Sequence, residues 1–250
     1  MHTSIRLLTA ALVLGAALPV VGAAPATAAP TAPAAVMVAN YTFDAGPVAG
    51  RVAENSGRGL PLTVRSSNAG GIKFSPPAKT GRYITFPPAC AAAAMATCPK
   101  VLLEAANDAD LNPGTRTFRW GASVMVQKAQ VTDSSNVMQK GATTTDSQWK
   151  LQIGAKAGKA QCVVVGKGLP KPYIVRSTVS VADGKWHKLL CLRSGVALTV
   201  SVDGTNRGTI AIPSTLSISN TRPMRIGGPN FTTTSDMYHG SLDSVYAMLG

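Results

Sequence analysis

Acidic residues are scarce in this chain. Its 250 residues include 11 Asp and Glu against 24 Lys and Arg, which gives a formal net charge of +13 at pH 7. Glycoside hydrolysis usually requires two carboxyl groups that face each other across the scissile bond. The aspartates here stand singly, mostly at turns, except for Asp108 and Asp110. The shortage of paired carboxylates predicts that the protein is not a glycosidase.

Other catalytic and metal-binding motifs are missing as well. The sequence has no G-x-S-x-G, no H-E-x-x-H and no P-loop. It has no C-x-x-C, and beyond His2 its only histidines are His187 and His239, so a zinc site is not expected. Aromatic residues make up 5% of the sequence and do not interleave with the basic ones, which disfavours nucleic-acid binding. We therefore predict no catalytic residues.

Long apolar runs are confined to the N-terminus. A positively charged start, an apolar run over 7–22 and a small-residue cleavage site at Ala28 indicate a signal peptide over 1–28. A Pro/Ala-rich spacer follows over 29–36, and residues 37–250 form one expected domain. No later stretch approaches the roughly 20 apolar residues of a membrane span. We expect a secreted, extracellular protein without a membrane span.

The four cysteines all lie beyond the signal peptide. Export would place them where disulfides persist, and four cysteines allow three pairings. Cys90 and Cys98 flank the small-residue segment AAAAMAT, so a local bridge between them is the simplest choice. That choice leaves Cys162 to pair with Cys191.

Strand-like alternation dominates the rest of the chain. The segment VALTVSVDG places Val196, Leu198 and Val200 on one face, a period of two that is typical of a β-strand. It ends at Asp203-Gly204, a dipeptide that favours a two-residue hairpin because both positions accept positive φ. Residues 205–212 return as the partner strand.

Similar short runs separated by Gly and Pro recur along the chain. They lie at 37–43, 60–65, 71–74, 82–86, 118–128, 135–140, 148–153, 160–165, 173–179, 224–226 and 241–248. Only 91–106 offers a helical turn or two, and Pro99 limits its length. Many short strands without alternating helices predict an all-β sandwich of antiparallel sheets.

The motifs, taken in order, resemble the bacterial laminin-G-like, concanavalin A-like jelly-roll domains. The resemblance rests on YTFDAG at 41–46, DGKWHKLLCLRSG at 183–195, LTVSVDG at 198–204 and HGSLDSVYAM at 239–248, with weaker matches at 108–126, 137–154 and 223–228. It covers nearly all of the mature chain. It implies a two-sheet antiparallel jelly-roll sandwich whose concave sheet binds glycans or proteins, and which in some branches cleaves polysaccharides. The Cys162–Cys191 pairing also resembles a secreted subgroup.

The enzymatic branches of this superfamily carry signatures that the sequence lacks. The hydrolases bear their carboxylates on one strand as E-x-D-x-x-E, and no such cluster occurs here. The lyases carry Q-I-H and K-A-G-x-Y-x-Q, which are also missing. A polysaccharide hydrolase or lyase remains the less favoured alternative.

The resemblance also implies a structural calcium ion near the joint of the first and last strands. Asp44 and Asp243 are the matching carboxylates. Backbone carbonyls would have to complete the shell, because Ca²⁺ prefers six to eight oxygens. The alternative is that each Asp caps its own turn. The EF-hand-like run that begins at Asp108 lacks the turn glycine, so it is expected to be a loop leading into a strand.

Exposed aromatic rings are the usual platforms for sugar rings. The candidates that lie in or near loops or at strand ends are Trp149, Tyr173, Phe231, Tyr238 and His239. For each of them the alternative is a packing role in the core.

The segment DGKWHKLLCL at 183–192 has apolar residues on both faces and is typical of an inner strand. Trp186 is expected to anchor the core, and Cys191 to form half of a disulfide. His187 is expected to be a strand residue with no carboxylate beside it in the sequence.

We expect a secreted, non-enzymatic, monomeric module that binds an extracellular carbohydrate or cell-envelope polymer. The positive charge favours anionic glycans, although lysines scattered over the wet face of a sheet would give the same count. An adhesion or protein-interaction domain is the main alternative.

Overall fold

The computed structural model describes residues 34–79, 81–131, 134–142, 146–154, 157–169, 171–231 and 236–250. They belong to one compact unit, Pro33–Gly250. The predicted signal peptide at 1–28 and the spacer up to residue 33 lie outside the described residues. Within the described part of the chain, no helix has the length and hydropathy to cross a bilayer.

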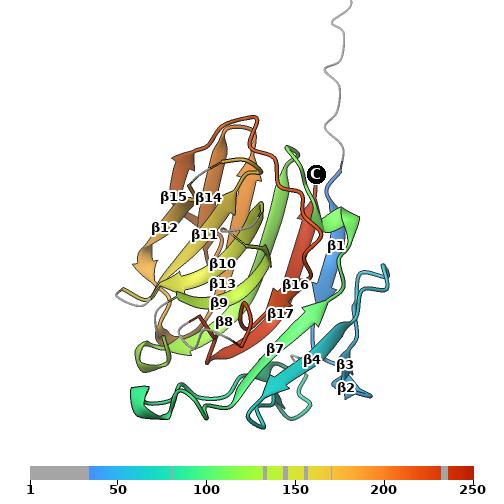
Figure 1. Ribbon diagram of the computed structural model, residues 1–250, viewed down its shortest axis with the longest axis vertical. Helices are drawn as coiled ribbons and strands as arrows, with labels where there is room; N and C mark the ends of the chain where they lie inside the picture. The colour runs from blue at the N-terminus through green and yellow to red at the C-terminus, as the bar shows by residue number, and fades with distance from the viewer. Residues whose placement is uncertain are drawn as a thin grey trace, which may run out of the picture. The chain divides into compact units, whose positions relative to one another are not determined.

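Two antiparallel sheets make up the fold (Figure 1). Sheet A runs in the order β15 (Thr205–Ala211), β14 (Ala197–Val202), β13 (Asp183–Ser194), β8 (Phe118–Gln127), β17 (Ser241–Leu249), β6 (Ile84–Thr85) and β5 (Lys73–Phe74), and β1 (Val36–Tyr41) also pairs with β17. Sheet B runs in the order β12 (Tyr173–Ser180), β11 (Lys159–Val165), β10 (Gln148–Gly154), β9 (Ser134–Gly141), β16 (Met224–Ile226), β7 (Lys100–Ala105), β4 (Leu62–Ser67), β3 (Arg51–Val52) and β2 (Pro47–Val48). The short 3-10 helices are η1 (Ala92–Ala94), η2 (Ala109–Leu111) and η3 (Lys128–Gln130). The predicted two-sheet jelly-roll sandwich is confirmed.

Turn chemistry determines the local register, as in the β14–β15 hairpin. Asp203 and Gly204 have φ of 53° and 76°, so both adopt the left-handed conformation that a tight two-residue hairpin requires. The backbone N–H of Asp203 donates to the carbonyl of Lys188, 2.9 Å away, and ties the turn to β13. The hairpin predicted at this dipeptide is confirmed.

The core lies between the sheets and is built around three aromatic rings. Trp120 from β8 and Trp149 from β10 are both 0% exposed. Each packs against Phe118, with ring centroids 5.3 to 5.8 Å apart across the trio. Rings from opposite sheets thus pack directly against one another.

Two disulfides stabilise the described residues, and both match the predicted pairing. Cys90 joins Cys98 within a loop, and Cys162 on β11 joins Cys191 on β13. Because β11 belongs to sheet B and β13 to sheet A, the second bridge links the two layers across the core.

The helical turn or two expected within 91–106 holds before Pro99 but not after it. One 3-10 turn, η1, is present, and after Pro99 the chain enters β7, an inner strand of sheet B between β16 and β4. Val101, Leu102 and Leu103 are all buried. A short strand that is apolar on both faces has no period of two, so its pattern cannot be told from that of a buried helix.

Candidate functional site

The outward face of sheet A carries a row of polar residues across three strands. Ser123 of β8 pairs with Lys188 of β13 on one side and with Asp243 of β17 on the other. Side chains alternate between the two faces of a strand, and the neighbouring residues Val124 and Leu189 are buried in the core. The Lys188, Ser123 and Asp243 side chains therefore project away from the core.

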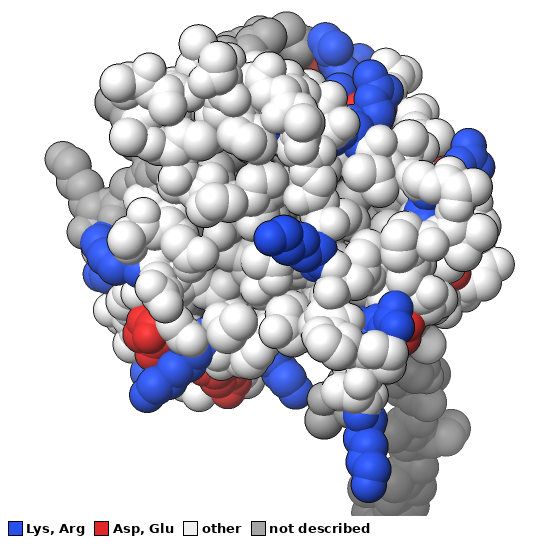
Figure 2. Space-filling model, turned by 90° about the horizontal axis from the view of Figure 1, so that it is seen from below, with Lys and Arg blue, Asp and Glu red and all other residues white. Residues whose placement is uncertain are grey.

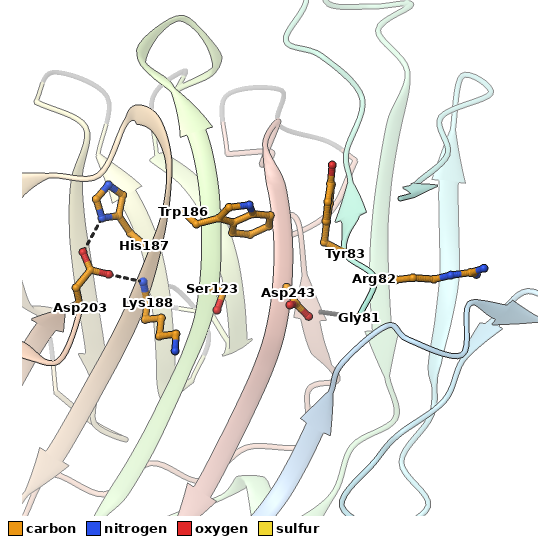
Figure 3. Close-up of a pocket in the computed structure, with 9 residues that line it drawn as sticks. All are labelled: Gly81, Arg82, Tyr83, Ser123, Trp186, His187, Lys188, Asp203 and Asp243. Atoms are coloured by element: carbon orange, nitrogen blue, oxygen red, sulfur yellow. Dashed lines mark hydrogen bonds and ion pairs between the residues drawn. The ribbon is translucent and has the colours of Figure 1, made fainter. Parts of the chain in front are cut away.

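A cavity of about 570 Å³ lies over this row and is called the Trp186 hollow here (Figure 3). It is lined by Arg82, Tyr83, Ser123, Trp186, Lys188 and Asp243, with further contributions from Gly81, His187 and Asp203. Its volume falls in the range of small-molecule sites, about 300–1,000 Å³. Aromatic, hydroxyl, cationic and anionic groups thus converge on one cavity.

Trp186 and Tyr83 form the aromatic wall of the hollow. Their ring centroids are 5.3 Å apart with planes at 68°, an edge-to-face contact. Figure 3 shows the two rings flanking β17, with Asp243 between them. Trp186 is 41% exposed. The expectation that it anchors the core was wrong, because Cys191 must face the core to reach Cys162, and Trp186, five residues earlier, lies on the opposite face.

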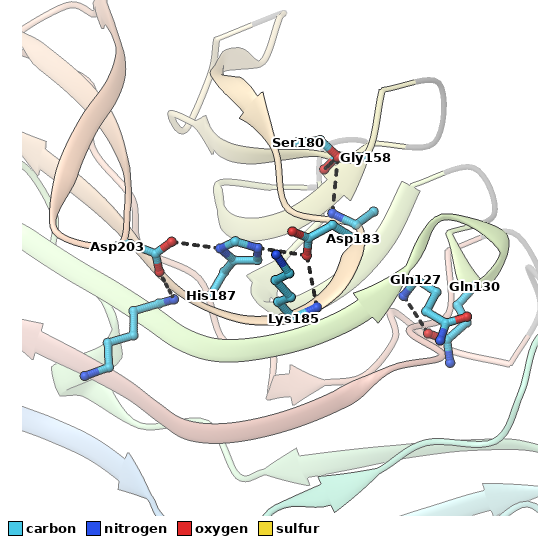
Figure 4. A network of polar contacts seen from close by, with 10 residues as sticks. Gln127, Gln130, Gly158, Ser180, Asp183, Lys185, His187 and Asp203 are labelled. Carbon is cyan, nitrogen blue, oxygen red and sulfur yellow. Dashed lines mark hydrogen bonds and ion pairs between the residues drawn. The ribbon is translucent and has the colours of Figure 1, made fainter.

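His187 lies between two carboxylates beside the hollow (Figure 4). Its Nδ1 is 2.8 Å from Asp203 Oδ2, and its Nε2 is 3.0 Å from Asp183 Oδ1. Asp203 also accepts the backbone N–H of Lys188 at 2.8 Å. The sequence identifies Asp203 only as a turn residue, and the β14–β15 turn places its carboxylate beside His187 of β13.

Burial alone would lower the pKa of His187, but its hydrogen bonds to Asp203 and Asp183 outweigh burial and raise that pKa above its ordinary value. Burial tends to raise the pKa of Asp203, but its hydrogen bonds with His187 and Lys188 lower that pKa overall. The backbone N–H of Lys185, followed by His187, lowers the pKa of Asp183. The imidazolium form is therefore favoured, since both ring nitrogens can then donate to ionised carboxylates.

His187→Gln should reduce stability more at acidic than at alkaline pH. A histidine whose folded pKa is raised stabilises the fold fully below its unfolded pKa of about 6.5 and loses that contribution as pH rises through the folded value. The free energy of unfolding of the two proteins, measured in urea from pH 5 to pH 9, should converge as pH increases. A difference that stays constant across this range would contradict the ion-pair assignment.

The predicted calcium ligands Asp44 and Asp243 lie close enough to interact electrostatically. Asp44 Oδ1 accepts the backbone N–H of Arg82 at 2.8 Å, which is the main reason that its pKa is lowered. Burial, and then the charge of Asp44, raise the pKa of Asp243. Asp243 also accepts the N–H of Ser244 at 2.6 Å. Within the described residues no group of three His, Cys, Asp or Glu could hold a metal.

Two of the five predicted ligand-binding residues belong to the core. Trp149 is 0% exposed, and its Nε1 donates to the carbonyl of Leu111 at 3.0 Å. Tyr238 is 1% exposed and donates to the carbonyl of Ser241 at 2.9 Å. Both side chains pack in the core and use their polar atoms in hydrogen bonds to the backbone. For these two residues the alternative of a packing role is therefore correct.

The other three predicted residues lie in different places. Tyr173 begins β12 and Phe231 precedes 232–235, which lie outside the described residues; both are half-buried, and neither lines the Trp186 hollow. His239 is 4% exposed and donates from Nδ1 to the carbonyl of Pro87 at 2.9 Å. Burial lowers the pKa of His239 and keeps it neutral at pH 7. It lines a separate cavity of about 330 Å³.

Three solved structures illustrate the fold relationship. Domain 4 of AbnA, a GH43 extracellular arabinanase from Geobacillus stearothermophilus in complex with arabinotriose, aligns with TM-score 0.64 and 15% identity over 86% of this chain and 93% of that one. The binding domain of Paraclostridial Mosquitocidal Protein 1 aligns with TM-score 0.59 and 9% identity over 84% and 48%. The binding domain of botulinum neurotoxin DC in complex with SialylT gives TM-score 0.58 and 8% identity over 85% and 47%.

These identities show a shared fold alone, and this chain spans about half the length of the two toxin domains. No curated protein matches the sequence significantly. Residues 105–247, more than half of the chain, match the laminin G family model that is described as the concanavalin A-like lectin/glucanases superfamily. The chain therefore belongs to the laminin-G-like group of the concanavalin A-like lectin/glucanases superfamily.

Proposed function

We propose that the protein binds an extracellular carbohydrate in the Trp186 hollow and does not cleave it. The observation that carries this proposal is the exposure of Trp186. Among the large hydrophobic side chains of the described residues, four are exposed, and Trp186 is the only aromatic one. A sugar offers an apolar ring face and polar hydroxyl groups, which suit an indole ring beside Ser123, Lys188 and Asp243.

The relatives and the cysteines support this proposal. One structural neighbour was solved with arabinotriose and another with SialylT. All four cysteines are paired, and disulfides persist mainly in oxidising, extracellular compartments. We therefore infer that the protein acts outside the cytoplasm.

The net charge favours an acidic glycan. Arg82 and Lys188 line the hollow, although Asp243 and Asp203 line it as well. Figure 2 shows the basic side chains spread over one face of the molecule, several of them beside carboxylates. Such a dispersed charge of +13 attracts polyanions through a long-range field that salt screens.

Trp186→Ala should weaken glycan binding at least about tenfold, a loss of about 1.4 kcal/mol, because the stacking surface disappears. A glycan array read at low and high salt with both proteins tests the proposal. Acidic glycans should bind best, and more weakly at high salt. Trp186→Phe, which keeps a ring, serves as the matched control and should retain part of the affinity. Equal binding by the wild type and Trp186→Ala would exclude the site.

An enzyme and an adhesion domain would each give a different result when the same purified proteins are tested. Release of reducing sugar or unsaturated uronate from a bound polymer would indicate an enzyme, a possibility raised by the glucanases of the superfamily. Capture of a cell-surface protein that soluble glycans do not displace would indicate an adhesion domain.

We also propose a structural calcium ion held by Asp44 and Asp243. Asp44 accepts the backbone N–H of Arg82, and Arg82 and Asp243 line the same cavity; hard oxygen donors of this kind suit Ca²⁺. With only two carboxylates at hand, backbone carbonyls would supply the remaining ligands.

Chelation should therefore lower the melting temperature of the wild-type protein by about 5 °C, because an ion that binds only the folded state stabilises it by mass action. Asp243→Asn should abolish that response. Asp183→Asn removes a carboxylate outside the proposed site and should retain it. Thermal unfolding with EDTA or with excess Ca²⁺ measures each case, and an unchanged wild-type melting temperature would exclude the ion.

A further inference from the structure

Two further cavities border the same face of sheet A as the Trp186 hollow. One, the Tyr246 hollow, has a volume of about 370 Å³, includes Leu190, Ser201 and Tyr246, and shares Ser123 and Lys188 with the Trp186 hollow. The other, the His239 hollow, is the cavity of about 330 Å³ that contains His239, Lys73, Thr85, Gln130 and Pro87. Each is large enough for a small ring-shaped ligand.

The strand register places residues of the Trp186 hollow and of the His239 hollow in one row across sheet A. Trp186 pairs with Met125, Met125 with Ser241, Ser241 with Thr85, and Thr85 with Lys73. These residues form one row across five strands of sheet A. One end of the row is the aromatic wall of the Trp186 hollow, and the other end lines the His239 hollow.

The three hollows follow one another along β17. His239 precedes the strand, Asp243 lies in the Trp186 hollow, and Tyr246 lies in the third cavity. Tyr246 shares its row with Leu190 through Gly121. From His239 to Tyr246 the chain advances by seven residues, roughly 23 Å at about 3.3 Å per residue of extended strand. The hollows therefore form a track much longer than one sugar ring.

Each hollow combines an apolar surface with hydrogen-bonding groups. Tyr246 and Leu190 lie beside Ser201 in one, and Trp186 and Tyr83 lie beside Ser123 in the next.

In the His239 hollow, Pro87 lies beside Gln130 and the neutral imidazole of His239. Because Nδ1 of His239 donates to the Pro87 carbonyl, Nε2 carries the lone pair and can accept a hydroxyl proton. A repeated pairing of apolar surface and hydrogen-bonding groups matches a chain of sugar rings.

We propose that the ligand is an internal segment of a linear polysaccharide that is long enough to occupy all three hollows. This inference rests on the proposed carbohydrate function. A terminal sugar would need only the Trp186 hollow, whereas a chain-internal segment gains contacts in all three.

The test uses affinity electrophoresis in gels that contain polygalacturonate or linear arabinan, with the matching mono-, tri- and hexasaccharides as competitors. The hexasaccharide should compete at least about tenfold better than the monosaccharide, because linked subsites act at high effective concentration. Lys73→Ala at one end and Ser201→Tyr, which fills the other, should each weaken polymer binding severalfold. Neither should change competition by the monosaccharide. Lys171→Ala, an exposed lysine outside the three hollows, is the matched control.

The outcomes separate the two proposals. If the polymer binds and Trp186→Ala abolishes binding, but the mono- and hexasaccharides compete equally, the extended track is excluded and the single site stands. If neither polymer retards the protein, both proposals fail. If the polymer binds and the end variants behave like Lys171→Ala, the track is likewise excluded.

Discussion

Removing the Cys162–Cys191 disulfide should lower the free energy of unfolding by about 3–4 kcal/mol. The bridge closes a sequence separation of 29 residues and joins β11 of sheet B to β13 of sheet A. Without it the unfolded chain regains the loop entropy that the bridge removes. Both cysteines are also 0% exposed, so the double variant Cys162→Ala/Cys191→Ala loses packing in the core as well. Urea unfolding under non-reducing conditions measures the loss.

The Cys90–Cys98 bridge provides the internal control. It closes a separation of only 8 residues within one loop, and loop entropy grows with the logarithm of loop length. Cys90→Ala/Cys98→Ala should therefore cost less than the inter-sheet variant. Peptide mapping of the wild type should recover Cys162 joined to Cys191. An equal loss from both variants would mean that the inter-sheet bridge contributes no more than a surface loop closure.

The parts of the fold that could be predicted are those in which local chemistry and burial agree. Asp203-Gly204 was identifiable because its positive φ is a property of the dipeptide itself. Strands with one wet face, such as β14, show the period of two. β7 was missed because its residues are buried on both faces of the strand, so its sequence carries no alternation.

The site was harder to predict because the position of a tryptophan in the fold, and not the residue type, determines whether its ring is buried or exposed. Trp149 and Trp186 both occur in strands, yet one is 0% exposed and the other 41%. The alternation of side chains along β13 could have predicted the exposure of Trp186. The disulfide requires Cys191 to face the core, and a residue five positions away in the same strand faces the other side. No sequence argument places Tyr83 beside Trp186, because that contact depends on which strands neighbour one another.

Arg193→Met should lower the free energy of unfolding by about 2–4 kcal/mol, because buried carbonyls would lose their donors. Arg193 is 0% exposed at the end of β13. Its guanidinium donates to the carbonyls of Arg116 at 2.8 Å, Ser214 at 3.2 Å and Leu216 at 3.1 Å. These hydrogen bonds connect the segment that follows β15 with the residues that precede β8. Burial lowers the pKa of the guanidinium, so losing the cost of the buried charge offsets part of the effect.

Two variants separate the hydrogen bonds of Arg193 from its charge and bulk. Arg193→Lys keeps the charge but lacks the planar fork that reaches three carbonyls at once, so it should recover only part of the stability. Arg176→Met removes an exposed arginine from β12 and should change stability by no more than about 0.5 kcal/mol. The midpoint of urea unfolding should fall for Arg193→Met while the slope stays constant. If Arg193→Lys is as stable as the wild type, the positive charge of residue 193 is sufficient for stability. The three simultaneous hydrogen bonds of the guanidinium would then contribute little to the free energy of unfolding.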